Sequence, residues 1–179
     1  MVTPDDVLQF WFSPETQPKW FAKDDAFDAE IRRKFSVLYE HIRDGAHAEW
    51  KDSPRGLLAL VIVLDQFPRN MFRGSPQAFA SDDLALTLAE LGIAKGFNVR
   101  LSPEERMFLY MPLQHAEKMD VQEQSVARFA ELEIDYALNY AREHRDIISR
   151  FGRFPHRNAV LGRTSSPEET EFLTTHAGF

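Results

Sequence analysis

Three segments of the sequence combine ionisable and amide side chains with helix-breaking residues, and they span residues 64–74, 110–117 and 144–163. Each contains a Pro or a Gly beside its polar residues. Polar groups next to a helix break can turn toward one another, whereas those along a regular helix lie on a solvated face. We therefore expect the three segments to form the walls of one polar pocket.

The third segment has the composition of an anion-binding site. Between residues 144 and 163 there are five Arg and two His but one acid and no Lys, although the whole chain has a net charge of −7. Arg presents planar donors that match a carboxylate or a phosphate, and several together can hold a small anion. The predicted ligand-binding residues are three arginines with the amides and the histidine of the same segments: Arg69, Arg153, Arg157, Asn70, Asn158, Gln66 and His144.

The same segments contain the groups for general acid–base chemistry. A histidine and a carboxylate within hydrogen-bonding distance can transfer a proton to or from a ligand. The candidates for this role are Asp65, Glu117, His115 and His156. Binding without catalysis is equally consistent with these residue types. A purely structural interpretation is also open, because Arg69 can pair with Asp65 one helical turn earlier.

Several other kinds of site are excluded or disfavoured. The chain has no Cys, which excludes disulfides, thiolate zinc sites, iron–sulfur clusters and cysteine nucleophiles. His115, Glu117, His144 and His156 are of metal-ligand types, but their spacing matches no metal motif, so we predict no metal site. No nucleophile elbow and no glycine-rich phosphate loop occurs. The sequence indicates no particular cofactor.

Charge and hydropathy bear on partners and location. The 28 acids outnumber the 21 Lys and Arg, which disfavours binding to nucleic acid or to an anionic membrane. The longest apolar stretch, residues 57–64, is too short to span a bilayer, and the N-terminus lacks a signal-peptide pattern. We therefore expect a cytoplasmic protein whose partner is a small anionic molecule. RNA binding through the Arg-rich segment is the least favoured hypothesis.

The starts of helices are marked by six Pro residues that follow Ser or Thr. Such a pair starts a helix because the hydroxyl caps one free N–H and the Pro ring removes another. Ser102 and Ser166 also fit the reciprocal capping box, each with Glu three residues later. These pairs, at residues 3–4, 13–14, 53–54, 75–76, 102–103 and 166–167, predict a helical protein.

The apolar residues between these starts recur every three or four positions, as in amphipathic helices. The stretches should end at Gly45, before Pro68, at Gly96 and at Gly152, and Pro112 should end or kink another helix. No stretch alternates with period two, so we expect no sheet. We predict a single all-α domain over residues 1–179, with about seven or eight helices in antiparallel hairpins.

Five motifs of the chain resemble, in order, the hallmark segments of a bacterial family, domain of unknown function 924. They are VLQFWF at 7–12, LDQFPRNMFRG at 64–74, MPLQHAE at 111–117, FGRFPHRNAVLGR at 151–163 and SSPEETEFL at 165–173. The resemblance implies a tetratricopeptide-like stack of helices. It transfers no catalytic residue, because the family has no established activity. It also raises an alternative function, a scaffold whose stacked helices bind a protein or peptide.

Overall fold

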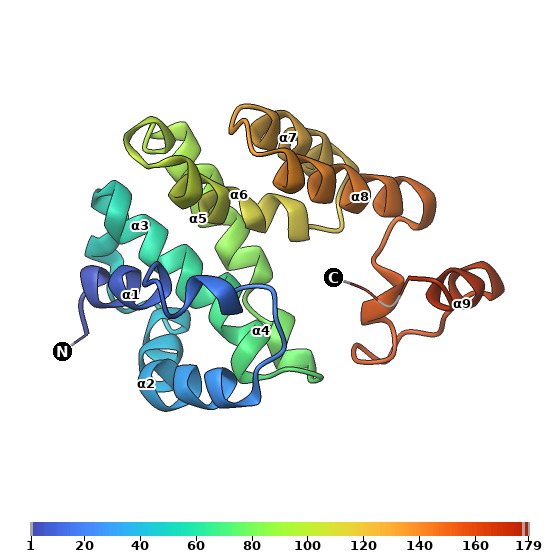
Figure 1. Ribbon diagram of the computed structural model, residues 1–179, viewed down its shortest axis with the longest axis horizontal. Coiled ribbons are helices and arrows are strands. Elements are labelled where there is room, and N and C mark those ends of the chain that lie inside the picture. Colours follow the sequence, from blue (N-terminus) through green and yellow to red (C-terminus); the bar gives the residue numbers. More distant parts are fainter. Residues whose placement is uncertain (1, 177, 179) are drawn as a thin grey trace.

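The computed structural model describes residues 2–176 and 178, and this part of the chain contains helices and no strand (Figure 1). A π turn at Ile62–Gln66 joins α3 and α4 into one continuous helix, so eight separate α-helical units result. The all-α prediction is therefore confirmed. The α-helices are α1 (Pro4–Trp11), α2 (Asp25–Arg43), α3 (Pro54–Val61), α4 (Phe67–Met71), α5 (Asp82–Ala94), α6 (Pro103–His115), α7 (Met119–Ala130), α8 (Asp135–Phe151) and α9 (Pro167–Leu173).

From α5 to α8, helices that follow one another in the chain also pack together. α5 packs against α6, α6 against α7, and α7 against α8, while α3 lies against α1, α5 and α6 (Figure 1). The connection between α7 and α8 is four residues long, which makes these two helices an antiparallel hairpin. No helix within residues 2–176 combines the length and apolarity needed to cross a membrane.

The helix that carries Asp65 is the centre of the core. Every residue from Leu57 to Gln66 is buried, so this helix is enclosed on all sides rather than on the one face that its apolar stripe predicted. Aromatic rings pack around it. Phe67 at the start of α4 stacks on Phe35 at 4.7 Å between ring centroids and meets Trp11 edge-on at 5.6 Å. This packing holds the polar residues that follow Leu64 in a dry environment.

Most of the Ser/Thr-Pro pairs start helices as predicted. Reciprocal capping boxes form at Thr3, Ser102 and Ser166, and the side chains of Ser53 and Ser75 each accept a backbone N–H. The pair at residues 13–14 is the exception. Ser13 Oγ accepts the N–H of Thr16 and closes a turn that does not continue as a helix.

One predicted helix end also differs. The prediction that a helix ends before Pro68 was wrong, because the chain continues through the π turn into α4. Pro68 has no N–H to give to the carbonyl oxygen of Leu64, and the hydroxyl of Ser81 donates to that oxygen instead at 2.6 Å. Arg69 Nη1 donates to the next carbonyl, that of Asp65, at 2.6 Å. Side chains therefore satisfy the backbone that the irregular turn leaves open.

Replacing Ser81 with Ala should destabilise the protein by about 1–3 kcal/mol, because the buried carbonyl of Leu64 loses its donor. Urea unfolding measures the loss. Thr87→Ala is the matched control on the same helix, since the exposed Thr87 hydroxyl donates only to its own helix, to Asp83 O. That variant should change stability by less than about 0.5 kcal/mol. Equal losses in the two variants would contradict this account.

The C-terminal end of α6 is fixed by α7. Pro112 lies inside α6, which continues to His115 and therefore does not end at the Pro. The buried Gln122 of α7 donates to the carbonyl oxygens of Gln114 and Ala116 at 2.7 and 2.8 Å. These bonds satisfy carbonyls that the end of a helix leaves free. They also hold His115 in a defined position.

Candidate functional site

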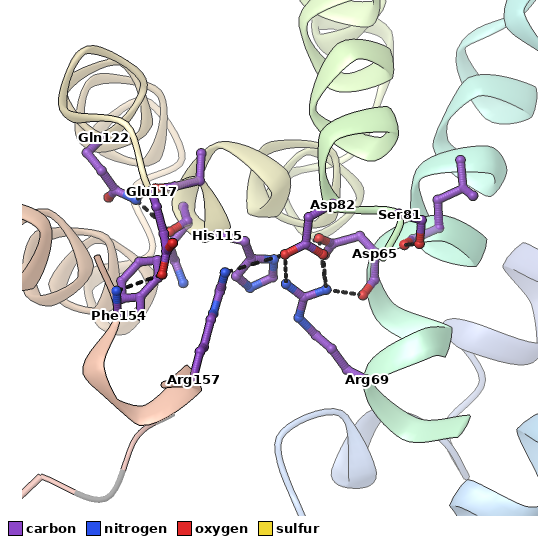
Figure 2. Close-up of polar contacts among 12 residues, drawn as sticks. Asp65, Arg69, Ser81, Asp82, His115, Glu117, Gln122, Phe154 and Arg157 are labelled. Atoms are coloured by element: carbon purple, nitrogen blue, oxygen red, sulfur yellow. Dashed lines mark hydrogen bonds and ion pairs between the residues drawn. The ribbon is translucent and has the colours of Figure 1, made fainter. Parts of the chain in front are cut away.

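The polar residues of the first two segments meet through a histidine and a carboxylate. His115 Nδ1 lies 2.8 Å from Oδ1 of the fully buried Asp65 (Figure 2). Gln66 Nε2 donates to the other Asp65 oxygen at 2.6 Å, and Arg69 Nη1 is 3.3 Å from Oδ1. The Asp65 carboxylate is therefore surrounded by donors. It also orients the ring of His115, as a carboxylate does for the histidine of many acid–base sites.

The electrostatics of this pair fix the protonation state of the histidine. Burial alone would raise the pKa of Asp65, but the charge of Arg69 and the bond from His115 outweigh it and hold the pKa at about 2. Burial, with the nearby Arg69 charge, lowers the pKa of His115. An ionised carboxylate only accepts, so Nδ1 of His115 carries the proton. Nε2 is then the basic nitrogen of a neutral ring.

Arg69 from the first segment and Arg157 from the third converge on Asp82, the first residue of α5 (Figure 2). Arg69 donates to both Asp82 oxygens, at 3.0 and 3.1 Å. Arg157 reaches the same carboxylate only at 3.5 Å, from Nη1 to Oδ2. Asp82 is thus bound in a bidentate manner by Arg69, and its contact with Arg157 is long.

Arg157 is held by aromatic rings rather than by a close carboxylate. Its guanidinium carbon lies 4.8 Å from the ring centre of Phe79 and 4.5 Å from that of Phe154. The residue is 7% exposed, and its Nε–H meets no acceptor in the part of the chain that the structure describes. Burial and the neighbouring charge of Arg69 lower the pKa of Arg157 to about 10, so it stays cationic at neutral pH.

Of the residues described so far, Phe79, Asp82, His115 and Arg157 border a cleft of about 310 Å³ between α5, the end of α6 and the segment after α8. This volume lies at the lower end of the range for small-molecule sites. The polar lining residues are Asp82, Asp83, His115, Glu117, Lys118 and Arg157. The larger apolar lining residues are Pro76, Phe79, Leu86, Pro112 and Leu161.

His144 and His156 lie behind the cleft. The ring centre of His144 is 6.2 Å from that of His115, and its Nδ1 donates to the carbonyl of Tyr140 at 2.8 Å. Burial, with the nearby His115, lowers the pKa of His144 to about 2. His156 packs on Phe154, and burial with the charge of Arg157 lowers its pKa to about 4. Neither histidine borders the cleft, so His115 is the better placed of the proposed proton carriers.

Glu117 borders the cleft, but its carboxylate oxygens are hydrogen-bonded by residues of the third segment. Arg163 donates to its two carboxylate oxygens at 2.6 and 3.0 Å, and the N–H of Phe154 donates at 2.8 Å. Burial would raise the pKa of Glu117, but these bonds keep it below its usual value. The carboxylate anchors the backbone on which Arg157 is carried, which favours a positioning role over a catalytic one.

Three of the predicted ligand-binding residues point elsewhere. Asn70 is buried between α2 and α4 and donates to Asp28 at 2.8 Å. Arg153 forms two bonds with Glu169, and Asn158 donates to Ser165, both at the base of α9. These contacts stabilise the fold, and Asn70, Arg153 and Asn158 are not among the residues that border the cleft.

Two important residues of the site escaped the sequence analysis. Asp82 follows Ser81 at the start of α5, where an acidic residue is ordinary because it suits the positive end of the helix. Phe79 lies in a short 3₁₀ helix and has the pattern of a core residue. In residues 2–176 and 178, no three His, Asp or Glu side chains are grouped as a metal site would require.

The fold and the site define a class of all-helical protein in which the start of α5, the end of α6 and the segment after α8 border one polar cleft. The chain belongs to a family of bacterial proteins of unknown function, DUF924, whose model matches residues 7–177. This confirms the resemblance in the five motifs. The chain is also similar to the solved structure of a protein of unknown function, ATU0120, from Agrobacterium tumefaciens. The two are 38% identical over 97% of each chain, with a TM-score of 0.92. A comparison with curated proteins gave no match.

Proposed function

We propose that the cleft binds a small anionic ligand through Arg157 and that His115 accepts a proton from this ligand. The observation that carries the proposal is the state of Arg157. It is a buried cation whose nearest described carboxylate, Asp82, is already bound in a bidentate manner by Arg69. A buried charge without a close partner is costly, and a bound anion would relieve that cost.

The position of His115 supports proton transfer. Its ring borders the same cleft as Arg157, and Asp65 holds its Nδ1. A neutral imidazole with a free Nε2 lone pair can act as a general base near neutral pH. An anion on Arg157 would therefore lie next to a base whose orientation is fixed before the ligand arrives.

Binding of the ligand should raise the melting temperature of the protein, and this stabilisation should disappear in Arg157→Gln. A ligand at one hundred times its dissociation constant stabilises the folded state by about 2.7 kcal/mol, which shifts the melting temperature by several degrees. A thermal-unfolding screen against carboxylated and phosphorylated small molecules measures the shift. Arg157→Gln removes the charge and the planar fork together.

Arg145→Gln is the matched control for this screen. Arg145 lies on α8, pairs with its neighbour Asp146 and does not border the cleft. The variant loses the same charge from the same segment, so the shift should remain. A ligand that stabilises both variants equally binds elsewhere, and a broad panel without any shift would contradict the proposal.

The alternative function, a scaffold for a protein or peptide, has less support. The large exposed apolar residues that the structure describes lie on separate elements, except for Tyr136 and Tyr140 one turn apart on α8. A peptide-binding groove would gather such residues into one patch. The cleft at Arg157 is the more specific feature.

A further inference from the structure

The charges around the cleft narrow the class of ligand beyond an anion. Three carboxylates border the cleft, those of Asp82, Asp83 and Glu117, against two cations, Arg157 and Lys118. Two of these carboxylates are already compensated, Asp82 by Arg69 and Glu117 by Arg163. Asp83 and Lys118 offset one another, which leaves the positive charge of Arg157 for one negative charge of a ligand. A second negative charge on the ligand would find no further unpaired cation among the described lining residues and would meet the repulsion of the carboxylates.

The neighbours of Arg157 restrict how an anion can reach it. Phe79 and Phe154 lie against the guanidinium at 4.8 and 4.5 Å from its carbon to their ring centres. The N–H groups of a guanidinium point outward in its own plane. An anion must therefore approach in that plane, in the manner that the flat, forked oxygens of a carboxylate match.

Apolar side chains also border the cleft. Those of Phe79, Leu86, Pro112 and Leu161 offer no charge. A cleft of 310 Å³ has room for roughly ten non-hydrogen atoms, taking about 30 Å³ for each water-sized group. A ligand of this size would place an apolar body against these side chains while its charged end meets Arg157.

From these three features we infer that the ligand is a small monocarboxylate with an apolar body, and not a phosphate ester or another dianion. The inference rests on the proposed function, since it assigns the ligand class of the same cleft. A phosphate monoester carries about −1.5 to −2 charge at pH 7, more than the one unpaired positive charge of Arg157 can compensate.

The probes that test this inference differ in one property at a time. 3-Phenylpropanoate has the proposed charge and body, 2-phenylethylphosphonate has the same body with a larger charge, and 3-phenylpropanamide has the body without charge. Acetate has the charge without the body. Titration calorimetry at pH 7.5 measures the dissociation constant of each for the intact protein, for Arg157→Gln and for Arg145→Gln.

We expect 3-phenylpropanoate to bind at least tenfold more tightly than the phosphonate, the amide and acetate. Its binding should weaken at least tenfold in Arg157→Gln and stay unchanged in Arg145→Gln. If the phosphonate binds more tightly and Arg157→Gln abolishes that binding, the monocarboxylate inference is wrong while the anion-binding function stands. Binding that is unaffected by Arg157→Gln, or no binding of either anion, would overturn both.

Discussion

Lowering the pH from 7 to 5 should reduce the free energy of unfolding by about 4 kcal/mol through His144 and His156. Burial lowers the pKa of these side chains in the folded protein to about 2 and about 4, below the value near 6.5 in an unfolded chain. The unfolded state therefore takes up more protons once the pH falls below about 6.5. The stability that the two neutral histidines contribute is fully present above that pH. It is lost as the pH falls toward their pKa values in the folded protein. His115, whose pKa is also lowered, acts in the same direction.

Urea unfolding at pH 7 and pH 5 measures this decline. In His144→Gln the difference between the two pH values should shrink by about 2 kcal/mol, because one buried neutral histidine has been removed. His41→Gln is the control, since His41 is exposed on α2 and meets water in both states. A decline that is the same in all three proteins would show that His144 does not contribute.

Replacing Asp65 with Asn should destabilise the protein by about 3–5 kcal/mol, the usual cost of removing one member of a buried ion pair. The substitution keeps the shape but removes the acceptor of His115 Nδ1–H and leaves the partly buried Arg69 with one carboxylate, Asp82, instead of two. The NH₂ group of Asn is a donor. Neither His115 Nδ1–H nor the Arg69 guanidinium can accept a hydrogen bond from it, because both are donors themselves. Equilibrium unfolding in urea at pH 7.5 measures the loss.

The control for Asp65→Asn is a carboxylate outside the core. Asp120 is exposed in the first turn of α7, so Asp120→Asn should cost no more than about 1 kcal/mol from the helix dipole. Comparable losses in the two variants would mean that the Asp65 charge is not compensated by its neighbours as described.

The helices could be predicted because their ends are encoded locally. Ser102 and Ser166 start helices through contacts within three residues, and Gly152 ends α8 in the left-handed conformation, with φ of 68°, that favours glycine. Pro68 is a misleading signal for the opposite reason. The donor that replaces its missing N–H comes from Ser81, 13 residues later, and no local pattern reveals such a partner.

The sequence could predict which segments form the site, but not which of their residues pair with one another. Asp65, Arg69, His115 and Arg157 meet, and each was proposed from residue type and from a nearby helix break. Arg153 and Arg163 belong to the same Arg-rich stretch, yet each is paired with a glutamate, Glu169 and Glu117. Which arginine remains for a ligand depends on tertiary contacts, and composition alone does not contain that information.

The π turn at Ile62–Gln66 is a point at which this helix can change its length. A π turn holds one residue more than the α-helical turn it replaces, yet both complete about one rotation around the helix axis. The residues before and after it therefore keep their relative orientation, and losing one residue here would restore a regular helix that still directs Arg69 toward Asp82. In evolutionary terms, a single residue gained or lost can be absorbed in this turn without reorienting the rest of the helix.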